Sequence, residues 1–126
     1  HLDHYQPEHL PTALTEIEQQ HVLSVSVAVD IPSYQRTKEI AAGSAWIVPT
    51  FGIHPWRAHA YADKLAELDS WIAETPLIGE IGLDYKQCLS ENVFFRFQTG
   101  ICFSVYMKHA GSAGGSPACL EAKTNL

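Results

Sequence analysis

Two polar side chains with catalytic potential stand at the ends of apolar, strand-like runs in this sequence. Glu80 lies between Gly79 and Gly82, and His54 ends the apolar run 46–53. A carboxylate within an apolar strand is costly to bury unless it meets a partner or a metal ion. The glycines predict a close approach of this backbone to a neighbour. Parallel strands present their carboxyl ends at one edge, where α/β barrels carry their chemistry, so we expect both side chains at the same edge.

Strands and helices are expected to alternate along the chain, which predicts an α/β fold with a parallel sheet. Apolar residues at helical spacing indicate helices, whereas valine-rich or continuous apolar runs indicate buried strands. The expected helices are 10–20, 34–42, 60–74 and 91–107, and the expected strands are 22–29, 46–53 and 77–83. The stretch 109–126 has the composition of a linker, and we expect it to be a disordered tail.

Three segments in this order resemble the TatD family of metal-dependent hydrolases. They are His-Leu-Asp at 1–3, Gly-Ile-His-Pro at 52–55 and Gly-Glu-Ile-Gly-Leu-Asp-Tyr at 79–85. The resemblance covers about residues 1 to 85 and fades beyond them. It implies a TIM (β/α)8-barrel metallohydrolase. Such a barrel takes about 250 residues, and this chain has 126. We therefore expect about the first half of a barrel over 1–108 and a divergent tail over 109–126.

The resemblance also implies roles for individual residues. Glu80 would be the catalytic carboxylate and a metal ligand, and His1 would be a second metal ligand. His54 would contact the substrate phosphate, while Asp84 and Tyr85 would lie on the substrate side of the pocket. Structural alternatives remain open: Glu80 could cap the next loop, His1 could be a frayed terminus, and His54 could be held in a tight turn.

The other acidic and imidazole groups carry weaker signals. Asp3 could orient a metal ligand through a hydrogen bond or could cap a helix. Asp30 ends the strand 22–29 and is expected at the same sheet edge. Four further histidines lack the spacing of metal ligands to one another and are expected on the surface: His4, His9, His21 and His59.

The function implied by the resemblance is metal-dependent hydrolysis of phosphodiester bonds, as in a TatD-like deoxyribonuclease acting on DNA. It implies two divalent cations, and carboxylate and imidazole ligands suit Mg, Mn or Zn. The family's further ligands, two later histidines and a late aspartate, have no counterpart here, so we expect a truncated and inactive chain. The alternatives are a non-catalytic fragment or gene-model product, and a metallo-barrel hydrolase of another ester or amide.

Composition limits the setting in which the protein acts. The net charge of −6 argues against general DNA binding, which needs lysine and arginine to neutralise phosphates. No apolar run reaches the ~20 residues of a membrane span. The three cysteines, Cys88, Cys102 and Cys119, form no CxxC pair, which favours a reducing, cytoplasmic location without disulfides. Nothing in the sequence predicts the oligomeric state.

Overall fold

The computed structural model describes residues 1–82 of the chain, apart from the side chain of Ala62. The α-helices are α1 (Leu10–Gln20), α2 (Ile31–Ala41) and α3 (Leu65–Glu74), and the strands are β1 (Ser24–Val27) and β2 (Ile47–Thr50). Three short 3-10 helices span Leu2–His4, Pro55–Ala60 and Ala62–Lys64. In this part of the chain, no helix has the length and apolar character needed to cross a membrane. The helix expected at 91–107, the tail expected at 109–126, and Asp84 and Tyr85 lie outside the described residues.

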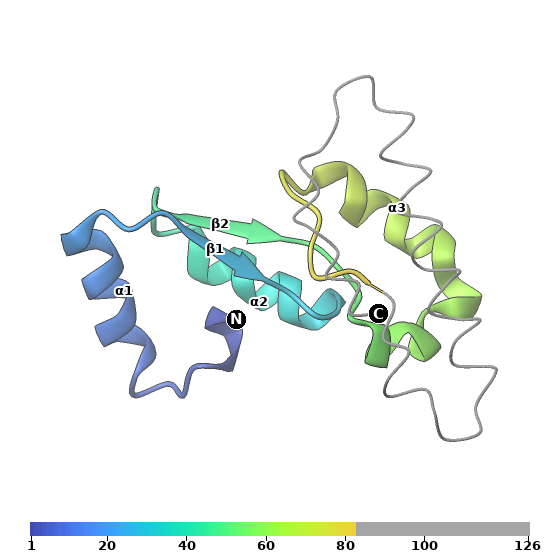
Figure 1. The fold of residues 1–126 in the computed structure, drawn as a ribbon, viewed down its shortest axis with the longest axis horizontal. Coiled ribbons are helices and arrows are strands. Elements are labelled where there is room, and N and C mark those ends of the chain that lie inside the picture. Colours follow the sequence, from blue (N-terminus) through green and yellow to red (C-terminus); the bar gives the residue numbers. More distant parts are fainter. Residues whose placement is uncertain (83–126) are drawn as a thin grey trace.

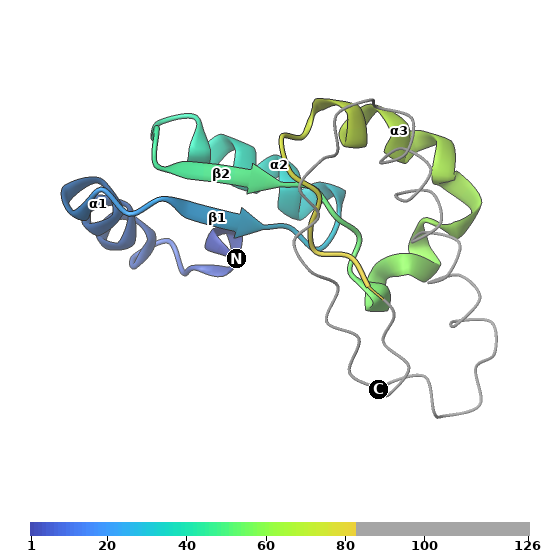
Figure 2. The ribbon, with the colours of Figure 1, turned by 45° about the horizontal axis from the view of Figure 1, so that its top comes forward.

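The two strands pair in parallel, and α2 connects them in one βαβ unit. Val25 of β1 lies opposite Val48 of β2 in the ladder. Helix α2 runs alongside the strands, α1 lies toward their amino ends, and α3 lies beyond their carboxyl ends (Figures 1 and 2). Parallel pairing of these two runs was predicted, although both strands are shorter than expected. The α/β class is confirmed in this part, and a complete or partial barrel remains what the family resemblance implies.

The third predicted strand, 77–83, is reduced to a single parallel bridge among the described residues. Ile78 pairs with Phe51, and the Gly79 N–H donates to the Phe51 carbonyl at 2.9 Å. The segment leaves the ladder immediately afterwards, because the Glu80 N–H donates instead to the carbonyl of Ala28 at 3.0 Å. The predicted neighbour relationship is therefore correct, whereas the predicted strand length is wrong for the described residues.

Helix α2 begins three residues earlier than the sequence pattern predicts, at Ile31 rather than Tyr34. The Asp30 carboxylate accepts a hydrogen bond from the Ser33 N–H at 2.9 Å, which is the geometry of a helix N-cap. Pro32 lies in the first turn, where a missing N–H costs nothing. Pro32, which lies outside the predicted helix 34–42, is thus part of the helix start.

The helix predicted over 60–74 is α-helical only from Leu65 onward. Lys64 adopts φ −130° and ψ 28°, which lies outside the helical region and prevents one continuous α-helix. The preceding chain instead forms the 3-10 helices Pro55–Ala60 and Ala62–Lys64. By contrast, α1 has the predicted bounds, with Pro11 in its first turn.

The main hydrophobic core lies at the carboxyl ends of the strands. Its buried members are Ala28, Tyr34, Phe51, Ile53, Leu68, Ile72 and Ile78. Tyr34 of α2 meets Phe51 edge to face, with ring centroids 5.2 Å apart, an arrangement favoured by the ring quadrupoles. Burial raises the pKa of the Tyr34 phenol, so this group stays neutral in the core. A smaller core joins α1 to the amino ends of the strands through Leu2, Leu10, Ile40 and Ile47.

A buried hydroxyl joins β2 to the segment that carries Glu80, and its removal should destabilise the fold. Thr50 is fully buried, and its Oγ1 donates to the Gly79 carbonyl at 2.7 Å. Thr50→Val keeps the shape but removes the donor, so we expect a loss of about 1–3 kcal/mol in the free energy of unfolding. Urea denaturation measures this loss.

The matched control is Thr15→Val, because the Thr15 hydroxyl donates to the Pro11 carbonyl on the exposed face of α1. We expect this change to stay within about 0.5 kcal/mol of the parent chain. Equal stability of the two variants would contradict a tethering role for Thr50.

Candidate functional site

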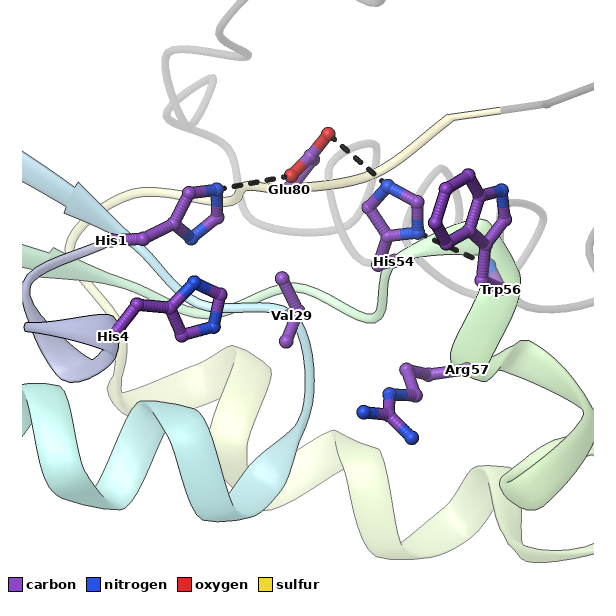
Figure 3. A pocket seen from close by; sticks show the side chains of 7 residues that line it. All are labelled: His1, His4, Val29, His54, Trp56, Arg57 and Glu80. Carbon is purple, nitrogen blue, oxygen red and sulfur yellow. Dashed lines mark hydrogen bonds and ion pairs between the residues drawn. The ribbon is translucent and has the colours of Figure 1, made fainter.

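Three of the predicted site residues converge at the carboxyl ends of the strands. His1 Nε2 lies 3.7 Å from Glu80 Oε2, and His54 Nε2 lies 3.5 Å from Glu80 Oε1. The carboxylate therefore stands between two imidazole rings, with one oxygen toward each (Figure 3). Its side chain is 42% exposed, so water or a ligand can reach it. The predicted juxtaposition of His54 and Glu80 is confirmed.

The backbone at the end of β1 determines this arrangement. The carbonyl of Ala28 accepts a hydrogen bond from the Glu80 N–H at 3.0 Å, and the carbonyl of Val29 accepts one from the His54 N–H at 2.9 Å. Adjacent residues of one chain segment thus hold the two functional residues. Both side chains consequently arise from neighbouring points of the same edge.

A glycine provides the space for the Glu80 backbone, but it is not one of the two glycines that the sequence suggested. A methyl group at Gly79 would make ordinary contacts, the nearest at 3.5 Å to Thr50 Oγ1, and one at Gly82 would meet nothing within 4 Å. At Gly52, by contrast, a Cβ atom would overlap the backbone of Gly79 and Glu80. The close approach therefore lies at Gly52, two residues before His54. Glycine is needed at this position because the backbone of Gly79 and Glu80 leaves no space for a Cβ atom, and not because of the φ angle of Gly52.

The hydrogen bonds of His54 assign its tautomer. Nδ1 accepts from the backbone N–H of Trp56 at 3.2 Å, so the lone pair is at Nδ1 and the ring proton is at Nε2. The Nε2–H group therefore faces Glu80 and the open side of the site. A donor at this position suits an anionic oxygen, whereas a metal ion would need the lone pair there. The two predictions for His54, a tight turn and a contact with the substrate phosphate, are thus compatible, because the turn orients the His54 ring.

His4 is exposed, as predicted, but it also lines the pocket, which the sequence pattern did not predict. It stacks on His1 with ring centroids 5.0 Å apart and an interplanar angle of 15°. The cause is the 3-10 helix Leu2–His4, in which residues three apart eclipse each other. His1 and His4 have this spacing, so recognising a 3-10 turn would have linked them. The other three histidines of the expected surface set, His9, His21 and His59, are exposed as predicted.

Asp3 completes a group of possible metal ligands. One ligand atom each from His1, Asp3 and His4 lies within 4.8 Å of the others. The Asp3 side chain is only 5% exposed, and its Oδ2 lies 3.4 Å from His4 Nε2. Its Oδ1 is buried and has no hydrogen-bond partner within the described residues. A buried carboxylate oxygen of this kind is costly, and a cation would offset that cost.

A pocket of about 400 Å³ lies beside Glu80. It is lined by His1, His4, Val29, His54, Trp56, Arg57 and Glu80. Among the described residues, the lining holds a single carboxylate against three imidazoles and one guanidinium. Asp30 caps α2 and is not among the residues that line the pocket. Its Oδ2 atom lies 3.8 Å from Arg57 Nε. Burial raises the pKa of the nearby Tyr61 phenol, which therefore adds no charge here.

A divalent cation fits the donor set that these residues provide. Imidazole nitrogens from His1 and His4 and a carboxylate oxygen from Asp3, which lie within 4.8 Å of one another, are ligands that suit Mg, Mn or Zn. Glu80 adds a second carboxylate 3.7 Å from His1 Nε2. The orphaned Asp3 oxygen is the structural observation that favours such an ion. Of the other predicted substrate contacts, Asp84 and Tyr85 lie outside the described residues.

The sequence also matches a known protein family. The sequence model of the TatD related DNase family matches residues 1–102. The chain belongs to this family. No curated protein and no solved structure matched the chain.

The family match corrects the extent of the predicted resemblance. It continues to residue 102 rather than fading after Tyr85, and it therefore includes Cys88 and Cys102. TatD-type proteins are metal-dependent hydrolases, so membership supports a hydrolase with nuclease chemistry at the level of the family. A barrel fold and metal binding are likewise family-level statements, and the α/β pairing of β1 and β2 is compatible with them.

The space at Gly52 yields a prediction for the site. Gly52→Ala places a methyl group against the Glu80 backbone, so we expect a loss of about 1–3 kcal/mol in the free energy of unfolding. The nuclear Overhauser contact between the Glu80 side chain and the His54 ring should also disappear.

Gly43→Ala is the matched control, because a methyl group there would meet nothing within 4 Å. It should leave both the stability and the contact unchanged. If Gly52→Ala kept the Glu80–His54 contact and the parent stability, the close approach would be wrong.

Proposed function

We propose that this site serves metal-dependent hydrolysis of phosphodiester bonds, with DNA as the substrate class. The observation that carries the proposal is Glu80 between the imidazoles of His1 and His54, in a member of the TatD related DNase family. One imidazole and the carboxylate can hold a cation, while the other imidazole offers an N–H donor. This division of roles is what a phosphoryl substrate at a metal site requires.

Glu80 and His1 would hold the metal, and the family suggests two ions. Asp3 would contribute its unpartnered oxygen or orient the imidazole of His4. When bound, divalent ions polarise a phosphoryl oxygen and activate water as a nucleophile. His54 would donate from Nε2 to a non-bridging phosphate oxygen, because its Nδ1 is already engaged by the Trp56 N–H. The hydrogen bond to Trp56 fixes this donor before the substrate arrives.

In the described lining of the pocket one carboxylate is balanced by one guanidinium, so bound cations would make the pocket favourable for an anionic substrate despite the net charge of −6. Glu80 is the sole carboxylate among the described lining residues, and Arg57 supplies a permanent positive charge. Cations bound at Glu80 would add further positive charge at that point. The substrate would thus be recognised at one phosphodiester rather than along an extended basic surface. A cytoplasmic setting, predicted from the cysteines, remains part of this proposal.

The test is a nuclease assay on the protein made from the longest open reading frame that contains these residues. Glu80→Gln removes the charge and keeps the shape, so we expect metal-dependent cleavage to fall by at least about 100-fold. The fold should survive, as judged by circular dichroism. The assay compares Mg, Mn and Zn on oligonucleotides, with a carboxyl ester and an amide as alternative substrates.

Glu16→Gln is the matched control, because Glu16 is exposed on α1, away from the pocket. This variant should cleave DNA at the parent rate. Near-parental turnover by Glu80→Gln would make Glu80 a structural residue, and cleavage of the ester or amide alone would contradict a phosphodiester substrate.

A second prediction concerns the 126-residue chain on its own. Catalytic metal sites need about three protein ligands held in place, and His1 and Glu80 are both about two-fifths exposed. We expect calorimetry to show Mn or Zn binding weaker than micromolar and no DNA cleavage. A micromolar or tighter stoichiometric site that is lost in Glu80→Ala, with cleavage by the same sample, would contradict this expectation.

A further inference from the structure

Trp56 is a large apolar side chain whose position the metal chemistry does not explain. Its side chain is 52% exposed, although burying an indole would stabilise the fold. Four other large apolar residues are exposed in the described part, namely Tyr5, Val22, Leu23 and Val25. Trp56 alone of this set lines the pocket. Its exposure therefore coincides with the site.

The local structure fixes Trp56 beside the proposed phosphate contact. The backbone N–H of Trp56 donates to His54 Nδ1, and the preceding Pro55 is buried. The indole meets the His54 ring edge to face, with centroids 5.1 Å apart (Figure 3). The group that faces the phosphate and the aromatic group thus come from neighbouring residues of one rigid turn. A ligand that reaches His54 Nε2 also reaches the indole.

We propose that Trp56 is a stacking platform for the nucleobase next to the phosphodiester that His54 contacts. This inference rests on the proposed function and specifies how the substrate is held. A nucleotide combines an anionic phosphate with a flat aromatic base, and the pocket combines an N–H donor with a flat indole. The guanidinium of Arg57, on the other side of Trp56 in sequence, lines the same pocket and can meet a flanking phosphate.

Stacking of this kind has two consequences for substrate choice. Every base has an aromatic face, so the platform tolerates any sequence. The face of a base is covered in a duplex and is open in a single strand or at a frayed end. Trp56 therefore selects single-stranded DNA or strand ends over the interior of a duplex.

A thermodynamic cycle between Trp56 and the base tests this inference. The chain is titrated against a fluorescein-labelled oligothymidine and against an abasic strand of the same length, with fluorescence anisotropy as the readout. EDTA is present throughout, so neither metal binding nor cleavage contributes. Trp56→Leu removes the aromatic face, Trp56→Phe keeps one, and Tyr5→Leu makes the matching change at an exposed aromatic residue outside the pocket.

We expect Trp56→Leu to weaken binding of the oligothymidine by roughly 5- to 150-fold, the range found for loss of one stacked base. Its affinity for the abasic strand should equal that of the parent chain, Trp56→Phe should keep most of the affinity, and Tyr5→Leu should keep all of it. Equal effects of Trp56→Leu on both strands, or no effect, would overturn the platform and leave the phosphodiester function standing. Failure of the parent chain to bind either strand would also overturn the platform, while the nuclease assay with added metal decides the phosphodiester function separately.

Discussion

Two adjacent backbone carbonyls at the end of β1 determine where the candidate site residues Glu80 and His54 lie. Ala28 accepts from the Glu80 N–H and Val29 from the His54 N–H, so two residues that are 26 positions apart leave the sheet side by side. The main core supports this point, because Ala28 and Phe51 are both fully buried. Together with the Phe51–Ile78 bridge and the Thr50–Gly79 hydrogen bond, these two hydrogen bonds set the position of Glu80 relative to His54.

The same constraint explains the division of chemistry within the site. His54 is committed at Nδ1 by the Trp56 N–H, which leaves a donor at Nε2 and makes the ring a partner for anionic oxygen. Among residues 1–82, the His1 ring accepts no such hydrogen bond, so its lone pair is available to a cation beside the carboxylate of Glu80. The carboxylate has one oxygen toward each ring. Cation and phosphate can therefore occupy opposite sides of Glu80.

Much of this arrangement could be predicted from the sequence, and the exceptions have physical causes. Strand order and the meeting of His54 with Glu80 follow from apolar runs that end in polar residues, since parallel strands align their carboxyl ends. The requirement for Gly52 could not be predicted, because its close contact is with a backbone 28 residues away. His4 is on the surface as predicted, but its stacking on His1 was not predicted, because it depends on a 3-10 turn, whose period of three differs from the α-helical pattern. A tertiary contact decided the case of Gly52, and a local 3-10 turn decided the case of His4.

The most direct test of the central claim is a crystal structure of the chain soaked in Zn, with data collected at the metal's absorption edge. The account predicts an anomalous peak within about 2.0–2.2 Å of a Glu80 carboxylate oxygen and of a His1 ring nitrogen, while His54 Nδ1 keeps its hydrogen bond to the Trp56 N–H. A peak coordinated by His54 Nε2, or a Glu80 side chain turned away from both imidazoles, would contradict it.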